Sequence, residues 1–140
     1  MGIASDLYHQ FETLHNAHEW AGLASLFAVD AVYAYPFGRL RGGESIRAYF
    51  ERMGKAFPDI QLTASLVIED QDVVVAEWRS RITHTGSFTM ADGGEIAAKG
   101  NTVEVAGVIV GTVRDGKFAS LRDYYDAADL MKQLGAMPSS

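Results

Sequence analysis

The sequence contains no cysteine, which excludes disulfides, thiolate metal sites, iron–sulfur clusters and cysteine nucleophiles. Basic residues are few, with 12 lysines and arginines against 18 acidic residues for a net charge of −6, and they form no basic run. A nucleic-acid partner requires a basic face that neutralises phosphates, so we expect none. No segment approaches the roughly 20 apolar residues of a membrane span, and the N-terminus has no signal-peptide pattern. We therefore expect a cytoplasmic protein with no membrane contact.

The 140 residues are enough for one domain with a buried core, which we place at 1–136, followed by a short tail at 137–140. Apolar residues spaced three or four apart predict a first helix that begins at an N-cap, Ser5, and ends near Asn16. The same spacing predicts a short second helix with Trp20, Leu23, Ala24 and Phe27 on one side. It also predicts a third helix around residues 46–53, which Pro58 closes.

A strand is expected at 31–37, stopped by Pro36 and the glycines that follow. From Ile60 the apolar period changes to two, which predicts strands over about 60–68, 73–85, 99–113 and 117–125, and then a helix over 127–134. Asp115-Gly116 favours a hairpin turn. This order predicts an α+β fold: a strongly curved, mostly antiparallel sheet wrapped as a cone-shaped barrel around three N-terminal helices, with a short C-terminal helix. An apolar pocket is expected inside the cone.

The strand over 73–85 carries two different faces. Alternation puts Trp78, Ser80, Ile82 and His84 on one face, which is apolar with polar interruptions, as a ligand pocket would be. The opposite face is a charged ladder of Glu77, Arg79 and Arg81, suited to solvent or to a second copy of the chain, so we expect a homodimer. His84 is a candidate site residue, with a hydrogen-bonded histidine at the strand end as the alternative.

Two aspartates lie near the end of the last strand, and one of them lacks a simple structural role. Asp126 precedes a helix and has Asp129 three residues later, so an N-cap explains it. Asp123 instead shares a strand face with Leu121 and Tyr125, where desolvation disfavours its charged form. It is therefore a candidate general acid or base, the alternative being a structural ion pair with Arg122 or another cation.

Two further patterns predict no site. His15, His18 and Glu19 fall at a helix end, where no third metal ligand has suitable spacing, so we expect a solvated helix terminus. The segment GTVRDGK at 111–117 lacks the Ser or Thr of a phosphate-binding loop and lies in a hairpin rather than before a helix. We accordingly expect no metal requirement.

Several segments, in order along nearly the whole chain, resemble the SnoaL-like polyketide cyclases, within the superfamily of nuclear transport factor two folds. They are NAHE at 16–19, RLRGGESIRAYFERM at 39–53, FPD at 57–59, EWR at 77–79 with HTG at 84–86, DGK at 115–117, and RDYYD at 122–126 before a helix that ends in QLG. The resemblance implies a cofactor-independent enzyme that closes an aldol ring with an aspartate as acid/base. Asp123 matches that aspartate, and His84 could assist it.

The resemblance implies cyclisation or isomerisation of a polycyclic or terpenoid-like substrate, an isomerase or lyase activity typical of secondary metabolism. The RDYYD stretch is also similar to limonene epoxide hydrolase, but Trp78-Arg79-Ser80 stands where that enzyme has its Arg-x-Asp. Ketosteroid isomerase shares the fold, and its base has no clear match here. The alternatives are therefore epoxide opening, or a non-catalytic module for ligand binding or dimerisation. The expected substrate-binding residues are Tyr33, Tyr35, Tyr49, Phe50, Met53, Trp78, Ser80, Phe88, Met90 and Tyr125.

Overall fold

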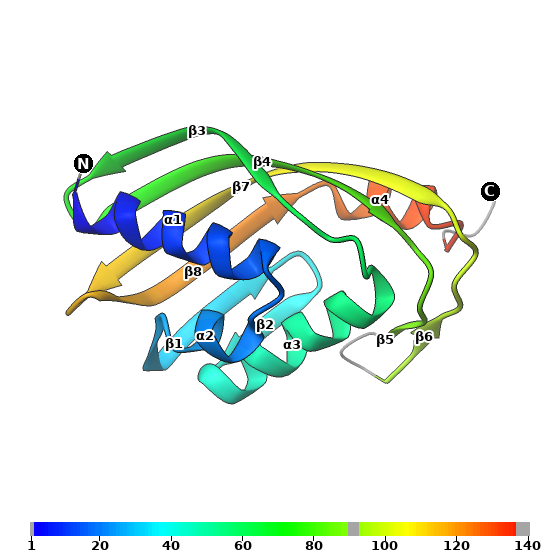
Figure 1. Ribbon diagram of the computed structural model, residues 1–140, viewed down its shortest axis with the longest axis horizontal. Helices are drawn as coiled ribbons and strands as arrows, with labels where there is room; N and C mark the ends of the chain where they lie inside the picture. The colour runs from blue at the N-terminus through cyan, green and yellow to red at the C-terminus, as the bar shows by residue number, and fades with distance from the viewer. Residues whose placement is uncertain (1, 90–92, 137–140) are drawn as a thin grey trace.

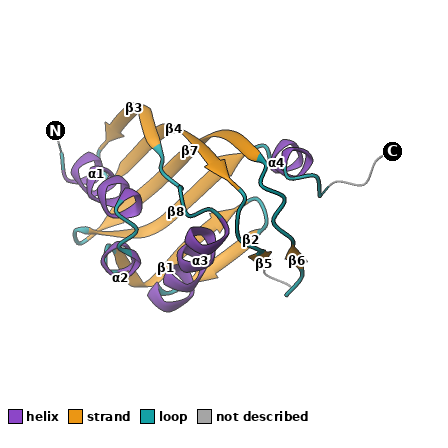
Figure 2. Ribbon diagram, turned by 45° about the vertical axis from the view of Figure 1, so that its right-hand side comes forward, coloured by secondary structure: helices purple, strands orange, loops and turns teal. Residues whose placement is uncertain are grey.

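The computed structural model describes residues 2–89 and 93–136 and shows helices packed against a curved sheet (Figures 1 and 2). The six-stranded sheet has the order β2-β1-β8-β7-β4-β3, and all its neighbours are antiparallel except β1 and β8. The predicted α+β class, mostly antiparallel sheet and C-terminal helix are confirmed. In chain order the elements are α1 (Ile3–Asn16), α2 (Trp20–Ala24), β1 (Phe27–Tyr35), β2 (Gly38–Arg41), α3 (Gly43–Ala56), β3 (Thr63–Asp70), β4 (Val73–Thr83), β5 (Phe88–Thr89), β6 (Glu95–Ile96), β7 (Thr102–Arg114), β8 (Lys117–Tyr125) and α4 (Ala127–Gln133).

The sheet is open rather than closed into the expected barrel. Among the described residues β2 and β3 are edge strands with one neighbour each. Strands β3, β4 and β7 bend along their length, and α1, α2 and α3 lie on the same face of the sheet (Figure 2). No helix in the described ranges is long and apolar enough to cross a membrane. The expected tail at 137–140 lies outside the described residues.

The core lies between the three N-terminal helices and the inner face of the sheet. The period of three to four in α1 and the period of two in β4 each bury one side of their element, as the sequence pattern predicts. Burial of each large apolar side chain stabilises the fold by about 1.5–3 kcal/mol. Core residues of α1, α3 and the long strands include Leu7, Tyr8, Phe11, Ile46, Phe50, Val74, Ala76, Ile109, Phe118 and Leu121.

The start of α1 differs from the prediction. The helix begins at Ile3, its N-cap is Gly2, and Ser5 is buried inside the first turn. A free backbone N–H of this turn is satisfied from outside the helix, because the amide of Ser5 donates to a carboxylate oxygen of Glu69 on β3 over 2.8 Å. An acidic group at a helix N-terminus also complements the helix dipole. Because Glu69 is far from Ser5 in the sequence, no local sequence pattern could predict this contact.

Two strand assignments in the first half are also corrected. Phe27, predicted on the second helix, begins β1 and pairs with Phe118 of β8. Its spacing from Leu23 fits a helix, and only the pairing with β8 makes it a strand residue. The segment after Pro36, for which no strand was predicted, contains the short edge strand β2. The small β5–β6 ribbon lies in a segment for which no strand was predicted.

Gly107 gives the sheet room for a large inner side chain. It pairs with Trp78 on one side and Tyr125 on the other, and a Cβ there would lie 2.6 Å from a ring carbon of Trp78 and 2.6 Å from the backbone oxygen of Tyr124. We expect Gly107→Ala to lower the free energy of unfolding by about 1–3 kcal/mol, because the indole and the backbone must shift. Urea unfolding measures this. Gly38→Ala is the control, since a Cβ at Gly38 meets nothing within 4 Å, and equal stability of the two variants would contradict the packing described here.

Candidate active site

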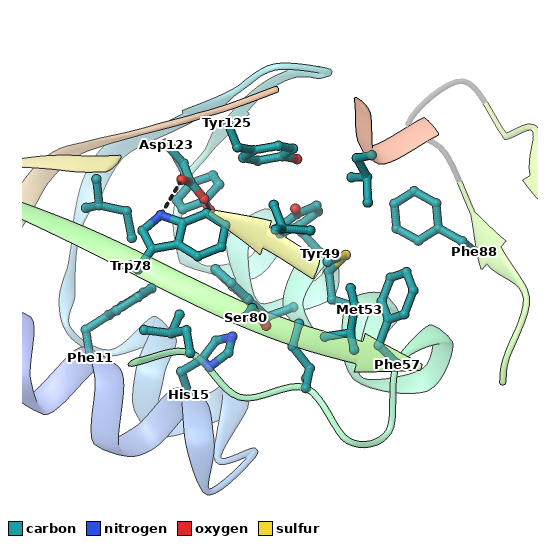
Figure 3. A pocket seen from close by; sticks show the side chains of 18 of the residues that line it. Phe11, His15, Tyr49, Met53, Phe57, Trp78, Ser80, Phe88, Asp123 and Tyr125 are labelled. Atoms are coloured by element: carbon teal, nitrogen blue, oxygen red, sulfur yellow. Dashed lines mark hydrogen bonds between the residues drawn. The ribbon is translucent and has the colours of Figure 1, made fainter. Parts of the chain in front are cut away.

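An apolar pocket lies between the inner face of the sheet and helices α1, α3 and α4 (Figure 3). Its empty volume is about 730 Å³, including solvent space at its mouth. The predicted site residues that line it are Tyr33, Tyr49, Phe50, Met53, Trp78, Ser80, Phe88, Asp123 and Tyr125.

Residues near both ends of the chain also contribute to the wall, and the sequence analysis did not predict them as site residues. Phe11 and His15 come from α1, where they continue the predicted apolar stripe at a spacing of four. Leu130 and Leu134 come from α4 and its C-cap. The apolar stripe on α1 is the sequence feature from which the inward position of His15 could have been predicted. The expectation of a solvated helix end is wrong for His15, which is only 3% exposed, whereas Glu19 is exposed as expected.

Among the described residues that line this pocket, Asp123 is the one that carries a carboxyl group. It lies on β8 opposite Ile109, and its two carboxylate oxygens accept hydrogen bonds from different donors. The hydroxyl of Tyr33 donates to Oδ2 over 3.0 Å, and the indole Nε1 of Trp78 donates to Oδ1 over 3.0 Å (Figure 3). Neither ion pair in the described part of the chain involves Asp123, so the structural pairing with Arg122 is not observed.

The surroundings of Asp123 place its titration near neutrality. Burial raises the pKa of Asp123 to about 7, although the hydrogen bonds from Tyr33 and Trp78 favour the charged form and oppose that shift. A carboxyl group with a pKa close to neutral pH can both accept and return a proton during a reaction. The geometry thus gives the pocket one proton-exchanging group held by two fixed donors.

Three tyrosines supply neutral hydroxyl groups beside Asp123. Burial is the largest cause that raises the pKa of Tyr33, Tyr49 and Tyr125 well above the usual value, so all three keep their protons at neutral pH. Tyr33 donates its hydroxyl hydrogen to Asp123, whereas Tyr49 and Tyr125, whose hydroxyl groups interact with each other, line the pocket with their rings toward it (Figure 3). These two can donate to an oxygen that becomes negative during a reaction.

The remaining predicted site residues lie in different places. Ser80 lines the pocket while its hydroxyl donates to the backbone oxygen of Gln61 over 2.6 Å. Tyr35 packs on the ring of Tyr49 at 4.7 Å and is not a lining residue of this pocket. Met90 lies outside the described residues.

His84 is fully buried next to the ring of Phe57 and does not line the pocket. Neither of its ring nitrogens makes a hydrogen bond to the described part of the chain. Burial lowers the pKa of His84. Backbone groups of Ile96 and Gly86 partly oppose this shift, although neither forms a hydrogen bond with the ring. The structure therefore separates His84 from the pocket in which Asp123 lies.

No group of three His, Asp or Glu side chains within residues 2–89 and 93–136 could hold a metal ion. The expected independence from metals and organic cofactors stays a prediction.

The family model described as SnoaL-like polyketide cyclase matches residues 5–134. No curated protein sequence matches significantly. Among solved structures, TsrD from Streptomyces laurentii superimposes with a TM-score of 0.79 at 25% identity over 96% of each chain. IdmH from Streptomyces antibioticus, provisionally assigned as a polyketide cyclase, gives 0.77 at 24% identity over 94% of this chain and 98% of its own. AclR from Streptomyces galilaeus, provisionally assigned as a hydroxylase, gives 0.80 at 23% over 97% of this chain and 87% of its own. These structural likenesses establish a shared fold and leave the reaction open.

Proposed function

Since the chain belongs to the SnoaL-like polyketide cyclase family, we propose that it is an enzyme that closes or isomerises a ring in a polycyclic or terpenoid-like molecule. The observation that carries this proposal is Asp123, a half-buried residue whose carboxyl group lines an apolar pocket and has its pKa raised to about 7 by desolvation. An apolar pocket with few polar groups suits a hydrophobic substrate. No metal or organic cofactor takes part in the proposed chemistry.

The proposed reaction is an intramolecular aldol closure. The carboxylate of Asp123 takes a proton from a carbon next to a substrate carbonyl group, which leaves an enolate. The enolate carbon attacks a second carbonyl carbon of the same molecule, so a carbon–carbon bond forms and an alkoxide results. Asp123 then returns its proton to that alkoxide, and the enzyme is regenerated. Return of the proton to a different carbon without ring closure would give isomerisation.

Neutral hydroxyl groups support the charge that develops on the substrate. Tyr49 and Tyr125 can donate to the enolate or alkoxide oxygen, and preorganised donors in a pocket of low polarity stabilise such charge strongly. Tyr33 and Trp78 hold the carboxylate of Asp123 in one orientation, so that its position is set before the substrate binds.

The test uses aromatic-fused diketones able to close by an aldol step, and an epoxide of similar size, in water labelled with oxygen-18. Aldol closure gives a product of unchanged mass, without label beyond that of an enzyme-free control. Epoxide hydrolysis instead adds one labelled oxygen from solvent, which would favour the hydrolase alternative. Stoichiometric binding without turnover of any substrate would favour a ligand-binding module and contradict the proposal.

We also propose that the chain forms a homodimer through the outer face of the sheet. Leu66 and Ile68 on β3 and Tyr124 on β8 are about half exposed, at 49%, 53% and 55%. By strand register, Val108 and Val110 lie between them on the same face. This apolar strip, which Glu77 of the charged ladder interrupts between Leu66 and Val108, favours a second copy as its occupant, since both partners would offer the same apolar and charged positions.

Sedimentation equilibrium tests the dimer. The native chain is expected at twice the 15.2 kDa of one chain, and Tyr124→Arg is expected to shift it toward the monomer, because an arginine there would be buried against apolar groups. Val29→Arg is the control: Val29 is 96% exposed on β1, away from this strip. A native chain that sediments only as 15.2 kDa contradicts the proposal.

A further inference from the structure

His15 has an unusual combination of burial and access to the pocket. It lies in the last turn of α1 and is 3% exposed, and its ring packs against Phe11, Trp20 and Phe50 with ring centroids 5.6–6.1 Å apart. It nevertheless belongs to the pocket wall, and its ring points toward the cavity (Figure 3). The large majority of buried polar side-chain atoms have a hydrogen-bond partner, so the partners of the two ring nitrogens show what this position can bind.

Hydrogen bonds fix which nitrogen of His15 carries the proton. The side-chain amide of Asn16 donates to the backbone oxygen of Leu62, and its oxygen accepts from the backbone N–H of Leu62, each over 2.8 Å. A backbone N–H can only donate and a backbone oxygen can only accept, so the orientation of the Asn16 amide is settled. The atom 3.0 Å from Nδ1 of His15 is therefore the Asn16 oxygen, which can only accept, and Nδ1 must hold a hydrogen.

The other ring nitrogen, Nε2, is left as an acceptor. Burial lowers the pKa of His15 to about 4, although the hydrogen bond to Asn16 opposes this shift, so the ring is neutral at pH 7. A neutral ring with its proton on Nδ1 presents a lone pair at Nε2. The described residues provide no hydrogen-bond donor for this atom.

We propose that His15 is a recognition residue of the pocket, whose Nε2 accepts a hydrogen bond from a phenolic or enolic hydroxyl group of the bound molecule. This inference deepens the proposed function, since it describes the substrate of the same pocket. His15 and Asp123 lie on either side of Trp78 (Figure 3). The substrate therefore carries its hydroxyl group away from the carbon that exchanges a proton with Asp123.

The lone pair of Nε2 also disfavours ligands that place a hydrogen-bond acceptor instead of a donor beside it. A carbonyl or ether oxygen at this place would bring two acceptors together, and Nε2 would lose solvent without gaining a partner. A neutral hydrogen bond of this kind corresponds to about a tenfold preference, and to more when the rejected ligand leaves a buried group unpaired. Selection of a hydroxyl-bearing ring is the expected result.

The test compares 2-naphthol with 2-methoxynaphthalene, which have similar shapes but differ in the donor, by titration calorimetry at pH 7. The native protein is expected to bind 2-naphthol at least about tenfold more tightly. His15→Phe keeps an aromatic ring and should abolish this preference while it leaves the affinity for 2-methoxynaphthalene unchanged. His9→Phe, on the exposed side of α1, is the matched control and should keep the preference.

The outcomes separate this inference from the proposed reaction. Asp123→Asn should retain the preference for 2-naphthol even if no turnover is ever found. A preference that survives His15→Phe and disappears in Asp123→Asn would overturn the assignment, and so would failure of the native protein to bind either probe. Nitrogen-15 NMR of the native protein gives a reading independent of any variant: Nδ1 of His15 is expected to carry the proton, and a proton on Nε2 would overturn the inference.

Discussion

Replacing Asp123 with asparagine is expected to lower turnover by about a hundredfold or more while the fold is retained, because an amide cannot exchange the proton. The local hydrogen bonds can persist. The asparagine oxygen can accept from the indole of Trp78, and its NH₂ can donate to the hydroxyl oxygen of Tyr33, which is able to reverse its role. The measurement is the rate of aldol closure per folded molecule, with circular dichroism as the check on folding.

Asp126→Asn is the matched control for this variant. Asp126 caps α4 by accepting from the backbone N–H of Asp129 over 2.9 Å, which confirms the role predicted for it. Asparagine caps helices as well as aspartate does, so turnover and stability should both stay close to native. Similar losses in the two variants, or full activity of the Asp123 variant, would remove Asp123 from the reaction.

The pH dependence of stability is expected to contain two large and opposite contributions. Asp123 titrates near 3.8 when unfolded and near 7 when folded, since burial raises its pKa. Between these values the folded protein keeps a proton that the unfolded chain has lost, so the free energy of unfolding falls by about 1.4 kcal/mol per pH unit, or about 4 kcal/mol in all. The full contribution is present below pH 3.8 and is lost as pH rises through about 7.

His15 acts with the opposite sign. Burial lowers its pKa from 6.5 to about 4, so between these values the unfolded chain holds a proton that the folded protein lacks. The free energy of unfolding then rises with pH, again by about 1.4 kcal/mol per unit. Over about pH 4 to 6.5 the two contributions nearly cancel in the native protein.

Urea unfolding of variants from pH 4.5 to 7.5 separates the two groups. The stability of Asp123→Asn minus that of the native protein should rise with pH, whereas the same difference for His15→Phe should fall. Taking differences removes the contributions of the other ionisable groups. A flat difference for Asp123→Asn would mean that this carboxyl titrates alike in the folded and unfolded chain.

The part of the site that sequence could predict follows from strand periodicity. Alternation over Leu121, Asp123 and Tyr125 fixes Asp123 on the inner face, and the same period puts Trp78 on the inner face of β4. The register between neighbouring strands could not be predicted, because periodicity shows which face of the sheet a residue occupies but not which residue lies beside it on the next strand. The contact of Trp78 with Asp123 depends on Gly107, which separates the two strands and leaves space for the indole.

The residues that sequence misplaced depend on contacts between distant segments. The sequence predicts that His15 lies at a solvated helix end, but in the fold the rings of Trp20 and Phe50 cover it. The sequence alternation of β4 extends to His84, but the strand ends at Thr83. The His84 ring packs against Phe57. In both cases the histidine's environment is set by packing that local patterns do not encode.

The central claim, that Asp123 is a buried acid/base group poised near neutral pH, is tested most directly without any substrate. Carbon-13 NMR of the side-chain carboxyl of Asp123, assigned by its loss in Asp123→Asn, reports its titration in the free protein. We predict a midpoint near pH 7, because burial raises the pKa to about that value. A midpoint close to the ordinary 3.8 would contradict the account.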